Sequence, residues 1–528
     1  MSSLYTKFYG SQVGGKSTTP HSYTSSPLGL LKHDILSALQ FYLYLPYIVF
    51  PLRPQLSGPL CELYPSRGNL YDMFLHLILI VMQLPFVLSV PFWLMFPVWT
   101  VVGGVAVFVM VNESVCYLLN GSEMEVESKK EYAERKKEHE HEQWIFLNGV
   151  AVGRNWLQSN VDRLALTFGR PVLGVHNKTN GIIFDVLQCL IQRNFTYATQ
   201  DVRDCYSIVK STLYQPHLTK VIFILHSQGG IEGGLIIDWL LQEVPQDLLA
   251  KLEVYTFGNA ANHFNNPHLH LLSQHAALMH PTTPATTKTT TSVHYHDPIQ
   301  AVPNPHATPL LHPEPNGVTS NGSPNTNPNL TNSTPLTTTT PKPITRQISR
   351  QESTSGKTIR YIEHYAHTSD FVACWGVLHF TKNFALGPSA PRFMGRVFER
   401  GGQGHQMNMH YLDGMFPLKA VTAGNSGFLG ANEDPDGNEF MHSILELGLG
   451  DEDSDDIQER TAEREGLAMS YLGAHGEPLE DADGENGDGR EEKMRFKVKD
   501  LSRLWLYVNG KSPRMDETDV GIARMATI

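Results

Sequence analysis

The longest apolar run of the chain extends from residue 73 to residue 112 and contains no Asp, Glu, Lys or Arg. A membrane-spanning helix needs about 20 apolar residues, so the run is long enough for two. Pro85, Pro91 and Pro97 lie near its middle, where they would kink or break a helix. The pattern predicts membrane insertion, either as two crossings or as a hairpin that enters one leaflet, and both return the chain to its starting side.

The segments on either side of this run differ from it in character. Residues 1–34 are mainly polar and do not resemble a cleaved signal peptide. Residues 35–52 are apolar and aromatic, which fits either a buried or interfacial helix or a membrane segment, so we group 35–121 as a membrane-associated helical region. Residues 122–143 carry mixed charges at helical spacing and predict a solvated juxtamembrane helix, whose basic residues favour the cytosolic side.

The pattern of residues 144–280 is that of a globular α/β domain. Short apolar runs alternate with amphipathic segments of helical length, which predicts a mostly parallel sheet with helices on both faces. The predicted strands are 144–152, 171–177, 220–227 and 252–260, and the predicted helices are 158–169, 182–194, 201–215 and 229–244. The same pattern resumes over residues 359–430, where 392–400 reads as a strand.

Two further regions interrupt or follow this domain. Residues 281–358 are rich in Thr, Pro, Asn and Ser and predict a disordered insertion, because they cannot bury enough apolar surface to offset the entropy of ordering. Ser349 and Ser353 each follow an Arg by three residues, a possible context for phosphorylation. Residues 431–493 turn acidic and predict a flexible tail, and residues 494–528 predict a C-terminal helical segment that docks on the domain.

Charge and cysteine content narrow the function. The formal net charge is -12, which argues against a nucleic-acid-binding protein. The five cysteines are odd in number and scattered, without a paired CxxC spacing, so we expect neither a disulfide scaffold nor a zinc site. We therefore expect the protein to reside in a reducing compartment. No phosphate-binding loop or cluster of metal ligands is evident, so no cofactor or metal is expected.

The strongest chemical signal is a strand that runs directly into Ser227 and then a helix. A serine at such a sharp turn is lifted above the sheet as a nucleophile, and small residues must flank it. Gly229 stands two positions after the serine, as G-x-S-x-G requires, whereas Leu225 occupies the position of the first glycine. The start of the following helix also favours developing negative charge.

A serine nucleophile needs a base, and the base needs a carboxylate that orients it. Asp370 is the only carboxylate between Glu363 and Glu399 and follows a strand-like run, although it could also cap the next helix. Two histidines follow the later strand. His405 lies in a glycine-rich loop and is favoured as the base, while His410 would lie inside a helix-like stretch and is the alternative.

The same chemistry needs two backbone donors for an oxyanion. One is expected from the N–H of Gln228, which follows the nucleophile directly. The other is expected from the loop after the first strand of the domain, at Gly149 and Val150, because the glycine lets the backbone approach a bound carbonyl.

Together these motifs resemble the α/β-hydrolase superfamily, particularly its lipase-like serine esterases. The carriers are HSQGG around Ser227, the strand-end Asp370, the later histidine and the FLNGV loop; LEVYTFGNAANHF is similar to the strand after the nucleophile in fungal-type triacylglycerol lipases. The resemblance covers about residues 144–280 and 358–418. It implies an α/β-hydrolase fold and ester hydrolysis through an acyl-enzyme, without a cofactor.

A membrane segment and lipase-like chemistry support one reading of the chain. We expect a membrane-anchored serine hydrolase that cleaves lipid or acyl esters, with its hydrolase domain in the cytosol at the endoplasmic reticulum or a lipid droplet. The alternative is a non-catalytic, membrane-anchored scaffold that keeps the hydrolase fold for interactions. Acyl-chain and head-group preference, the membrane concerned and the oligomeric state stay open.

Overall fold

The computed structural model describes residues 6–9, 26–54, 56–267, 358–382, 393–421, 427–447 and 496–513. The predicted insertion at 281–358, with Ser349 and Ser353, lies outside the described residues except for Thr358. Residues 448–495 of the predicted acidic tail also lie outside them.

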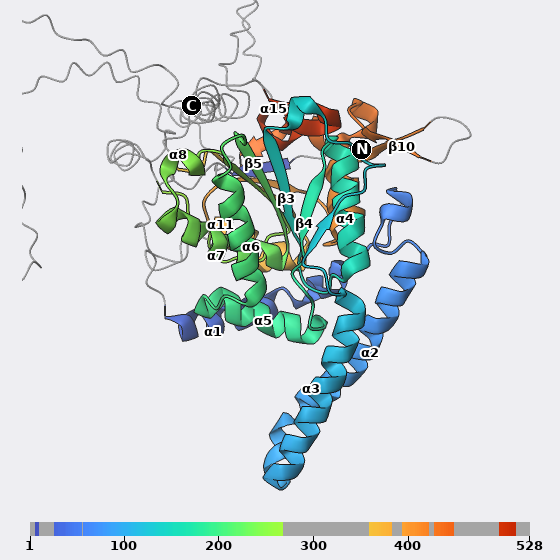
Figure 1. Ribbon diagram of the computed structural model, residues 1–528, viewed down its shortest axis with the longest axis vertical. Coiled ribbons are helices and arrows are strands. Elements are labelled where there is room, and N and C mark those ends of the chain that lie inside the picture. Colours follow the sequence, from blue (N-terminus) through green and yellow to red (C-terminus); the bar gives the residue numbers. More distant parts are fainter. Residues whose placement is uncertain are drawn as a thin grey trace, which may run out of the picture. The chain divides into compact units, whose positions relative to one another are not determined.

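The described part of the chain is a mixed α/β structure around a nine-stranded sheet (Figure 1). The order is β11-β1-β8-β7-β6-β5-β3-β4-β2, and every pairing from β8 to β4 is parallel. Only the pairings β1–β8 and β2–β4 are antiparallel within this sheet. The strands are β1 (Thr6–Tyr9), β2 (Glu125–Glu127), β3 (Glu142–Leu147), β4 (Val172–Val175), β5 (Lys220–His226), β6 (Leu252–Phe257), β7 (Tyr361–His367), β8 (Arg396–Arg400) and β11 (Leu445–Leu447), with β9 (Leu418–Ala420) and β10 (Phe428–Ala431) in a separate pair.

Helices connect the strands and cover both faces of the sheet (Figure 1). The α-helices are α1 (Pro27–Gln40), α2 (Arg67–Ser89), α3 (Val98–Asn120), α4 (Arg154–Phe168), α5 (Ile182–Phe195), α6 (Gln200–Leu213), α7 (Gln228–Glu243), α8 (Gln246–Leu249), α10 (Phe371–Trp375), α11 (Val377–Lys382), α12 (Asp413–Met415), α13 (Glu439–His442) and α15 (Val498–Leu501). The 3-10 helices are η1 (Tyr42–Ile48), η2 (Gly58–Leu60), η3 (Val90–Met95), η4 (Lys137–His139), η7 (Pro435–Gly437) and η8 (Leu504–Gly510), and η6 (Met407–Leu412) is a π-helix.

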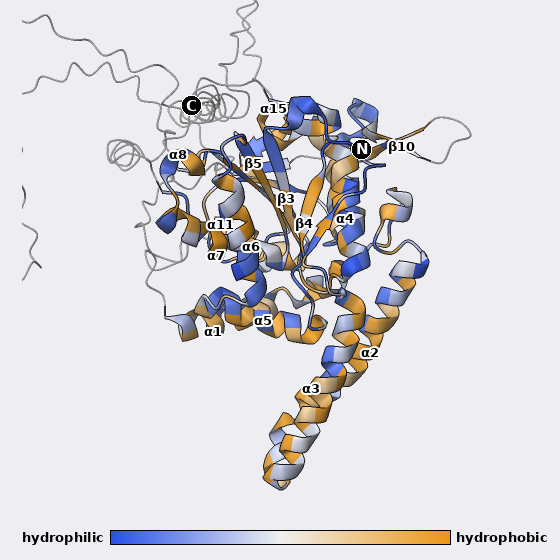
Figure 2. Cartoon of the chain, viewed as in Figure 1, coloured by the Kyte–Doolittle hydropathy of each residue, from blue (hydrophilic) through white to orange (hydrophobic). Residues whose placement is uncertain are grey.

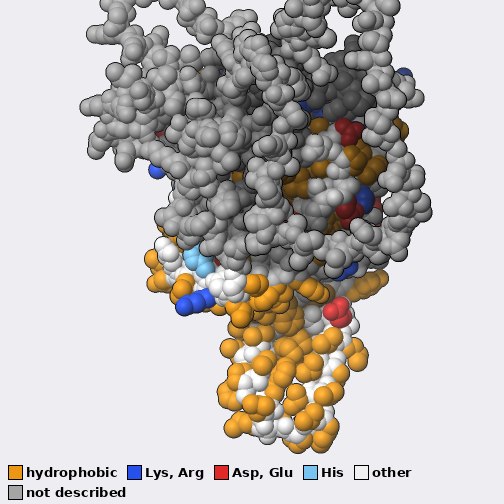
Figure 3. Space-filling view, turned by 90° about the vertical axis from the view of Figure 1, so that its left-hand side faces the viewer, with side chains coloured by type: hydrophobic (Ala, Val, Ile, Leu, Met, Phe, Trp, Pro, Cys, Tyr) orange, Lys and Arg blue, Asp and Glu red, His pale blue; other side chains and the backbone are white. Residues whose placement is uncertain are grey.

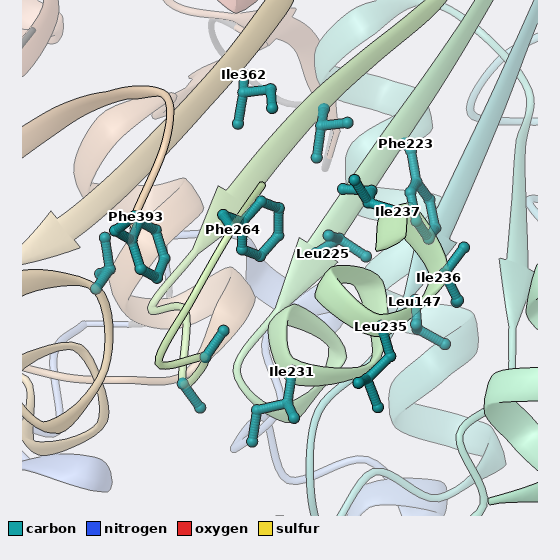
Figure 4. Close-up of a cluster of buried hydrophobic side chains, with 14 of the residues drawn as sticks. Leu147, Phe223, Leu225, Ile231, Leu235, Ile236, Ile237, Phe264, Ile362 and Phe393 are labelled. Atoms are coloured by element: carbon teal, nitrogen blue, oxygen red, sulfur yellow. The ribbon is translucent and has the colours of Figure 1, made fainter. Parts of the chain in front are cut away.

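The alternation of side chains along β5 explains why both faces are covered. Successive residues of a strand point to opposite faces. Phe223 and Leu225 join one core cluster with residues of α6 and α7, whereas Ile222 and Ile224 join a second cluster with residues of α4 and η8 (Figure 4 shows part of the first). A strand that is apolar at every position is therefore buried on both faces, as in other parallel sheets.

One predicted element is wrong, and two other segments contribute strands that the sequence did not predict. Residues 122–143 do not form a juxtamembrane helix: they contain β2 and η4, and β3 starts at Glu142. β2 pairs with β4 at the sheet edge, so backbone pairing overrides the helical charge spacing. The polar segment 1–34 contributes β1, and residues 431–447 of the predicted tail contribute β11, which pairs with β1.

The 35–121 region also divides into two kinds of structure. α2 and α3 pack side by side and are each long and apolar enough to cross a membrane; Figure 2 shows both as mainly hydrophobic. Ser57 and residues 60–62, in contrast, are buried, and Glu62 accepts hydrogen bonds from the backbone amides of Asn408 and Met409. The predicted membrane region is thus partly a piece of the protein core.

Candidate active site

Ser227 lies at the sharp turn between β5 and α7. Its backbone has φ 57° and ψ -119°, a left-handed φ that is uncommon for a residue other than glycine. The turn also needs small neighbours. A Cβ on Gly229 would lie 2.6 Å from the Leu147 carbonyl oxygen, and one on Gly230 would lie 2.1 Å from Asn259 Oδ1. The two glycines therefore let the start of α7 approach the ends of the neighbouring strands.

Leu225, which departs from the expected glycine, is accommodated by a glycine elsewhere. Its side chain is fully buried, and a Cβ added to Gly233 would lie 2.3 Å from Leu225 Cδ1. The missing Cβ on α7 thus leaves room for the larger side chain on β5. In the sequence, Leu225 stands out only as a departure from the motif. The residue that compensates for it, Gly233, lies eight positions later, in the segment GGIEGG of α7.

The structure brings together Ser227, His405 and Asp370, which come from three separate parts of the chain. His405 Nε2 lies 2.8 Å from Ser227 Oγ, and His405 Nδ1 lies 2.8 Å from Asp370 Oδ2. All three residues are buried. Parallel strands place their carboxyl ends at one edge of a sheet, and the loops after β5, β7 and β8 carry these residues to that edge. The arrangement can pass a proton from the hydroxyl to the imidazole.

Asp370 is held as the charged partner of the imidazole. Burial raises the pKa of its carboxyl, but the nearby His405 and hydrogen bonds from His405 and Tyr411 outweigh burial, so that the pKa falls below its ordinary value. The Tyr411 hydroxyl donates to Asp370 Oδ2 at 2.6 Å, and the Val372 amide donates to Oδ1 at 2.9 Å. Asp370 therefore both caps α10 and faces His405. Tyr411 was missed in the sequence, where nothing marks it out from other aromatic residues.

His410, the alternative base, does not reach the serine. Its Nδ1 accepts from the Gln406 amide at 3.0 Å, and its Nε2 lies 2.9 Å from the Pro51 carbonyl oxygen, to which it donates. Burial lowers its pKa to about 4, so the imidazole is neutral near pH 7. His410 thus connects the loop that carries His405 to the segment after η1. His410 is therefore not the base, although the sequence offered it as the alternative to His405.

His226, beside the nucleophile, contacts both the backbone and the ring of His405. Its Nε2 lies 2.9 Å from the His405 carbonyl oxygen, and the two rings stack with centroids 4.9 Å apart. Burial and the neighbouring His405 lower the pKa of His226 to about 3. A neutral ring that donates to this carbonyl fixes the backbone of His405 without adding charge beside it.

The loop after β3, residues 148–152, reaches the serine as expected. A Cβ on Gly149 would lie only 2.5 Å from Ser227 Cβ, so no other residue fits without displacing the loop. Among the hydrogen bonds of the described residues, none has the amide of Val150 or Gln228 as its donor. Free N–H groups beside a nucleophile can stabilise an oxyanion. Gly149 therefore lies against Ser227, Val150 is the next residue of the same loop, and Gln228 follows the serine directly.

A polar network behind this loop holds it in place. Asn148 and Asn177 pair through two hydrogen bonds of 2.9 Å, and Asn177 Nδ2 donates to Gln228 Oε1 at 3.0 Å. The Ala151 amide donates to Asp185 Oδ2 at 2.9 Å, and Ala151 itself has a left-handed φ of 57°. Side chains of α5 and α7 and the loop after β4 thus determine the shape of the 148–152 loop.

A buried serine, imidazole and carboxylate in series, with free amides beside the serine, is an arrangement that can activate a hydroxyl for attack on a carbonyl. No family model, curated protein or solved structure matches this chain. The geometry of the site is therefore the ground for any function assigned to it.

Proposed function

We propose that this chain is a membrane-anchored serine hydrolase that cleaves lipid or acyl esters. The observation that carries the proposal is the single imidazole of His405, which lies 2.8 Å from both Ser227 Oγ and Asp370 Oδ2. This series of contacts is what hydroxyl activation requires, and an ordinary structural serine has no need of it.

The proposed reaction follows the geometry. Ser227 Oγ attacks the ester carbonyl while His405 Nε2 accepts the hydroxyl proton, and the free amides of Val150 and Gln228 stabilise the oxyanion. His405 then gives that proton to the leaving alcohol, which leaves an acyl group on Ser227. A water molecule, deprotonated by His405, releases the acid and restores the serine. Asp370 holds the imidazole and stabilises its positive charge throughout.

An α/β-hydrolase fold and a lipase-like relation are part of the proposal. The mostly parallel sheet, the serine at a strand-to-helix turn and the chain order serine, aspartate, histidine all fit that fold. The apolar α2 and α3 support membrane attachment, and an enzyme held at a bilayer or lipid-droplet surface meets ester-linked acyl chains there. We place the domain on the cytosolic side of the endoplasmic reticulum or of a droplet.

A fluorophosphonate probe tests the chemistry directly. We expect the full-length protein to be labelled, Ser227→Ala to lose all labelling, and Ser211→Ala, which changes an exposed serine on α6, to keep it. Both variants should melt at the wild-type temperature. A correctly folded wild type that is not labelled would favour the alternative, a membrane-anchored scaffold without catalysis.

A substrate panel tests the lipid part of the proposal. We expect hydrolysis of long-chain acyl esters or of acylated peptides presented on vesicles, and loss of it in Ser227→Ala. Activity confined to short, water-soluble esters would retain the serine hydrolase but reject the lipid substrate.

A further inference from the structure

The apolar hairpin of α2, η3 and α3 is only partly embedded in the protein. Gln83 is fully buried, and its Nε2 donates to Asn112 Oδ1 at 2.8 Å and to the Asn180 carbonyl oxygen at 2.6 Å. This is the last place where the two arms meet the domain through buried polar groups. None of residues 84–111 is buried, and Leu94 in the turn is 96 % exposed. We call residues 84–111 the free hairpin.

The free hairpin is too short to cross a bilayer. An α-helix rises about 1.5 Å per residue, so the roughly 14 steps from Asn112 back to Val98 span about 21 Å. The other arm gives a similar length, since Gln83 to Ser89 is α-helical and η3 rises about 2 Å per residue. The hydrocarbon core of a bilayer is about 30 Å thick, and its headgroup regions add about 5–7 Å on each side. A tip about 21 Å below Gln83 would therefore reach the bilayer midplane.

The turn of the hairpin is suited to hydrocarbon rather than water. Trp93 Nε1 donates to Ser89 Oγ at 2.9 Å, Ser89 Oγ donates to the Phe86 carbonyl at 2.6 Å, and Thr100 Oγ1 donates to the Pro97 carbonyl at 2.6 Å. Polar groups without a water partner must be satisfied internally. Trp99 differs, since no acceptor for its indole appears among the described residues.

The turn sequence also argues against emergence on the far side. Residues 90–97, VPFWLMFP, contain no charged or hydrogen-bonding side chain except the indole of Trp93, and two prolines remove backbone donors where the helix direction changes. A loop between two complete crossings would expose this sequence to water. We propose that the free hairpin enters a single lipid leaflet and ends near the bilayer midplane, so that the protein is monotopic.

A second apolar surface adjoins the hairpin at the level of Gln83. Phe184, at the start of α5, makes edge contacts with Phe86 and Phe108 of the hairpin. Beyond it, α5 exposes Val186, Leu187 and Ile191, and α1, which packs on α5, exposes Leu36 and Leu39. Figure 3 shows hydrophobic side chains continuing from the hairpin onto the adjoining part of the surface. These helices fit the membrane interface while the hairpin enters the leaflet.

Cysteine accessibility tests the proposal, because all five native cysteines are buried. Leu94→Cys places a thiol at the tip, and Lys129→Cys is the control, since the Lys129 side chain is 55 % exposed. In proteoliposomes with the domain outward, we expect an impermeant maleimide to label Lys129→Cys at once and Leu94→Cys only after detergent. Labelling of Leu94→Cys in intact vesicles, or once the lumen is opened without detergent, would overturn the proposal.

Monolayer binding supplies a second measurement. A one-leaflet hairpin can enter a phospholipid monolayer around a triacylglycerol droplet, whereas a pair of crossings cannot. We expect the full-length protein to bind such droplets and Leu94→Glu to weaken binding at least tenfold. Binding to bilayers but not to droplets would contradict the proposal, as would a detergent-free soluble dimer whose tip is protected. The inference rests on the proposed membrane attachment but not on the chemistry: Ser227→Ala should behave as the wild type in both assays.

Discussion

The β5–α7 region and the free hairpin are similar in composition but opposite in exposure. Both are runs of aliphatic and aromatic residues with paired glycines, Gly233 and Gly234 in one and Gly103 and Gly104 in the other. All residues of β5 are buried, whereas none of residues 84–111 is. A Cβ on Gly233 would lie 2.3 Å from Leu225, while one on Gly103 would have nothing within 4 Å. Apolar composition alone therefore does not say which surface covers a segment.

Hydrogen bonds distinguish the two regions more clearly. Around Ser227 they join residues far apart in sequence, such as the contact of His405 with Ser227. In the free hairpin the side-chain bonds join residues three or four positions apart, as between Trp93 and Ser89. The first pattern requires the whole fold, and the second requires only the hairpin. A change in the first region should therefore have effects that the same change in the second does not.

The largest expected effect is at the imidazole that joins the three parts of the site. We expect His405→Asn to lower kcat for an ester substrate by about 10⁴-fold, because the hydroxyl loses its base. His410→Gln should retain far more activity, since His410 bonds to the Pro51 carbonyl rather than to Ser227. Steady-state kinetics on both purified variants measure the difference. Equal losses would mean that His405 acts only through folding.

The next largest effect is on stability, and it compares the buried glycine pair of α7 with the exposed pair of α3. We expect Gly233→Ala to lower the free energy of unfolding by about 1–3 kcal/mol, because the new methyl group meets Leu225 in a filled core. Gly103→Ala is the matched control and should be neutral or stabilising by up to about 1 kcal/mol, since alanine is the better helix former. Thermal melting in one detergent compares them.

The double variant Leu225→Ala/Gly233→Ala sharpens this measurement. If the two residues share one space, the double variant should be more stable than the sum of the single losses predicts, because the new methyl partly fills the cavity left by the leucine. Strict additivity would show that Gly233 does not make room for Leu225.

How far the sequence alone predicts the site differs between its parts. The alternation of apolar and polar segments predicted the parallel strands, and the strand–serine–helix pattern placed Ser227 at the turn, because both signals are local. The glycine-rich loop favoured His405 over His410, but only the fold shows that His410 points to Pro51. Tyr411 and the Leu225–Gly233 pair gave no usable signal, since their roles depend on contacts between distant elements.

The edge strands of the sheet were not predicted from the sequence, for the same reason. The charge pattern of residues 122–143 predicted a helix, but three of those residues pair with β4. β1 and β11 are short: β1 joins the sheet by pairing with β8, and β11 joins it only through β1. Strand pairing of this kind depends on partners hundreds of residues away, which local propensity does not report.

A smaller effect is expected of pH on the free energy of unfolding. It arises from buried histidines, and the free hairpin contains no histidine. Burial lowers the pKa of His410 to about 4 and that of His226 to about 3, whereas an unfolded histidine titrates near 6.5. The unfolded chain therefore binds more protons below pH 6.5, so stability is full above that pH and falls as the pH drops towards 4.

The size of this effect can be isolated at one imidazole. From pH 6.5 to pH 5, His410 alone should cost about 1.6 kcal/mol, so we expect His410→Gln to flatten the decline of the unfolding free energy by about that amount. The Gln side chain can still donate to the Pro51 carbonyl. Denaturation curves at several pH values measure the slope, and parallel slopes for the variant and the wild type would refute the assignment.

The smallest effect lies where the two regions meet. Asp185 accepts from the Ala151 amide in the 148–152 loop and from the Asn180 amide, whose own carbonyl accepts from Gln83 of the hairpin. Asp185→Asn turns an NH₂ group toward one of these donors and leaves it unpaired. We expect kcat to fall about tenfold, or about 1.4 kcal/mol, with little change in KM, because the loop that carries the Val150 amide loses its support.

Asp247→Asn, which changes an exposed carboxylate on α8, is the control and should leave kcat unchanged. Gln83→Leu should have a smaller effect of the same kind, because it removes the donor to the Asn180 carbonyl at the base of the hairpin. If the hairpin base reaches the 148–152 loop through residues 180–185, the two substitutions should be less than additive in kcat. Strict additivity would mean that the hairpin only tethers the domain and that the sheet shapes the site by itself.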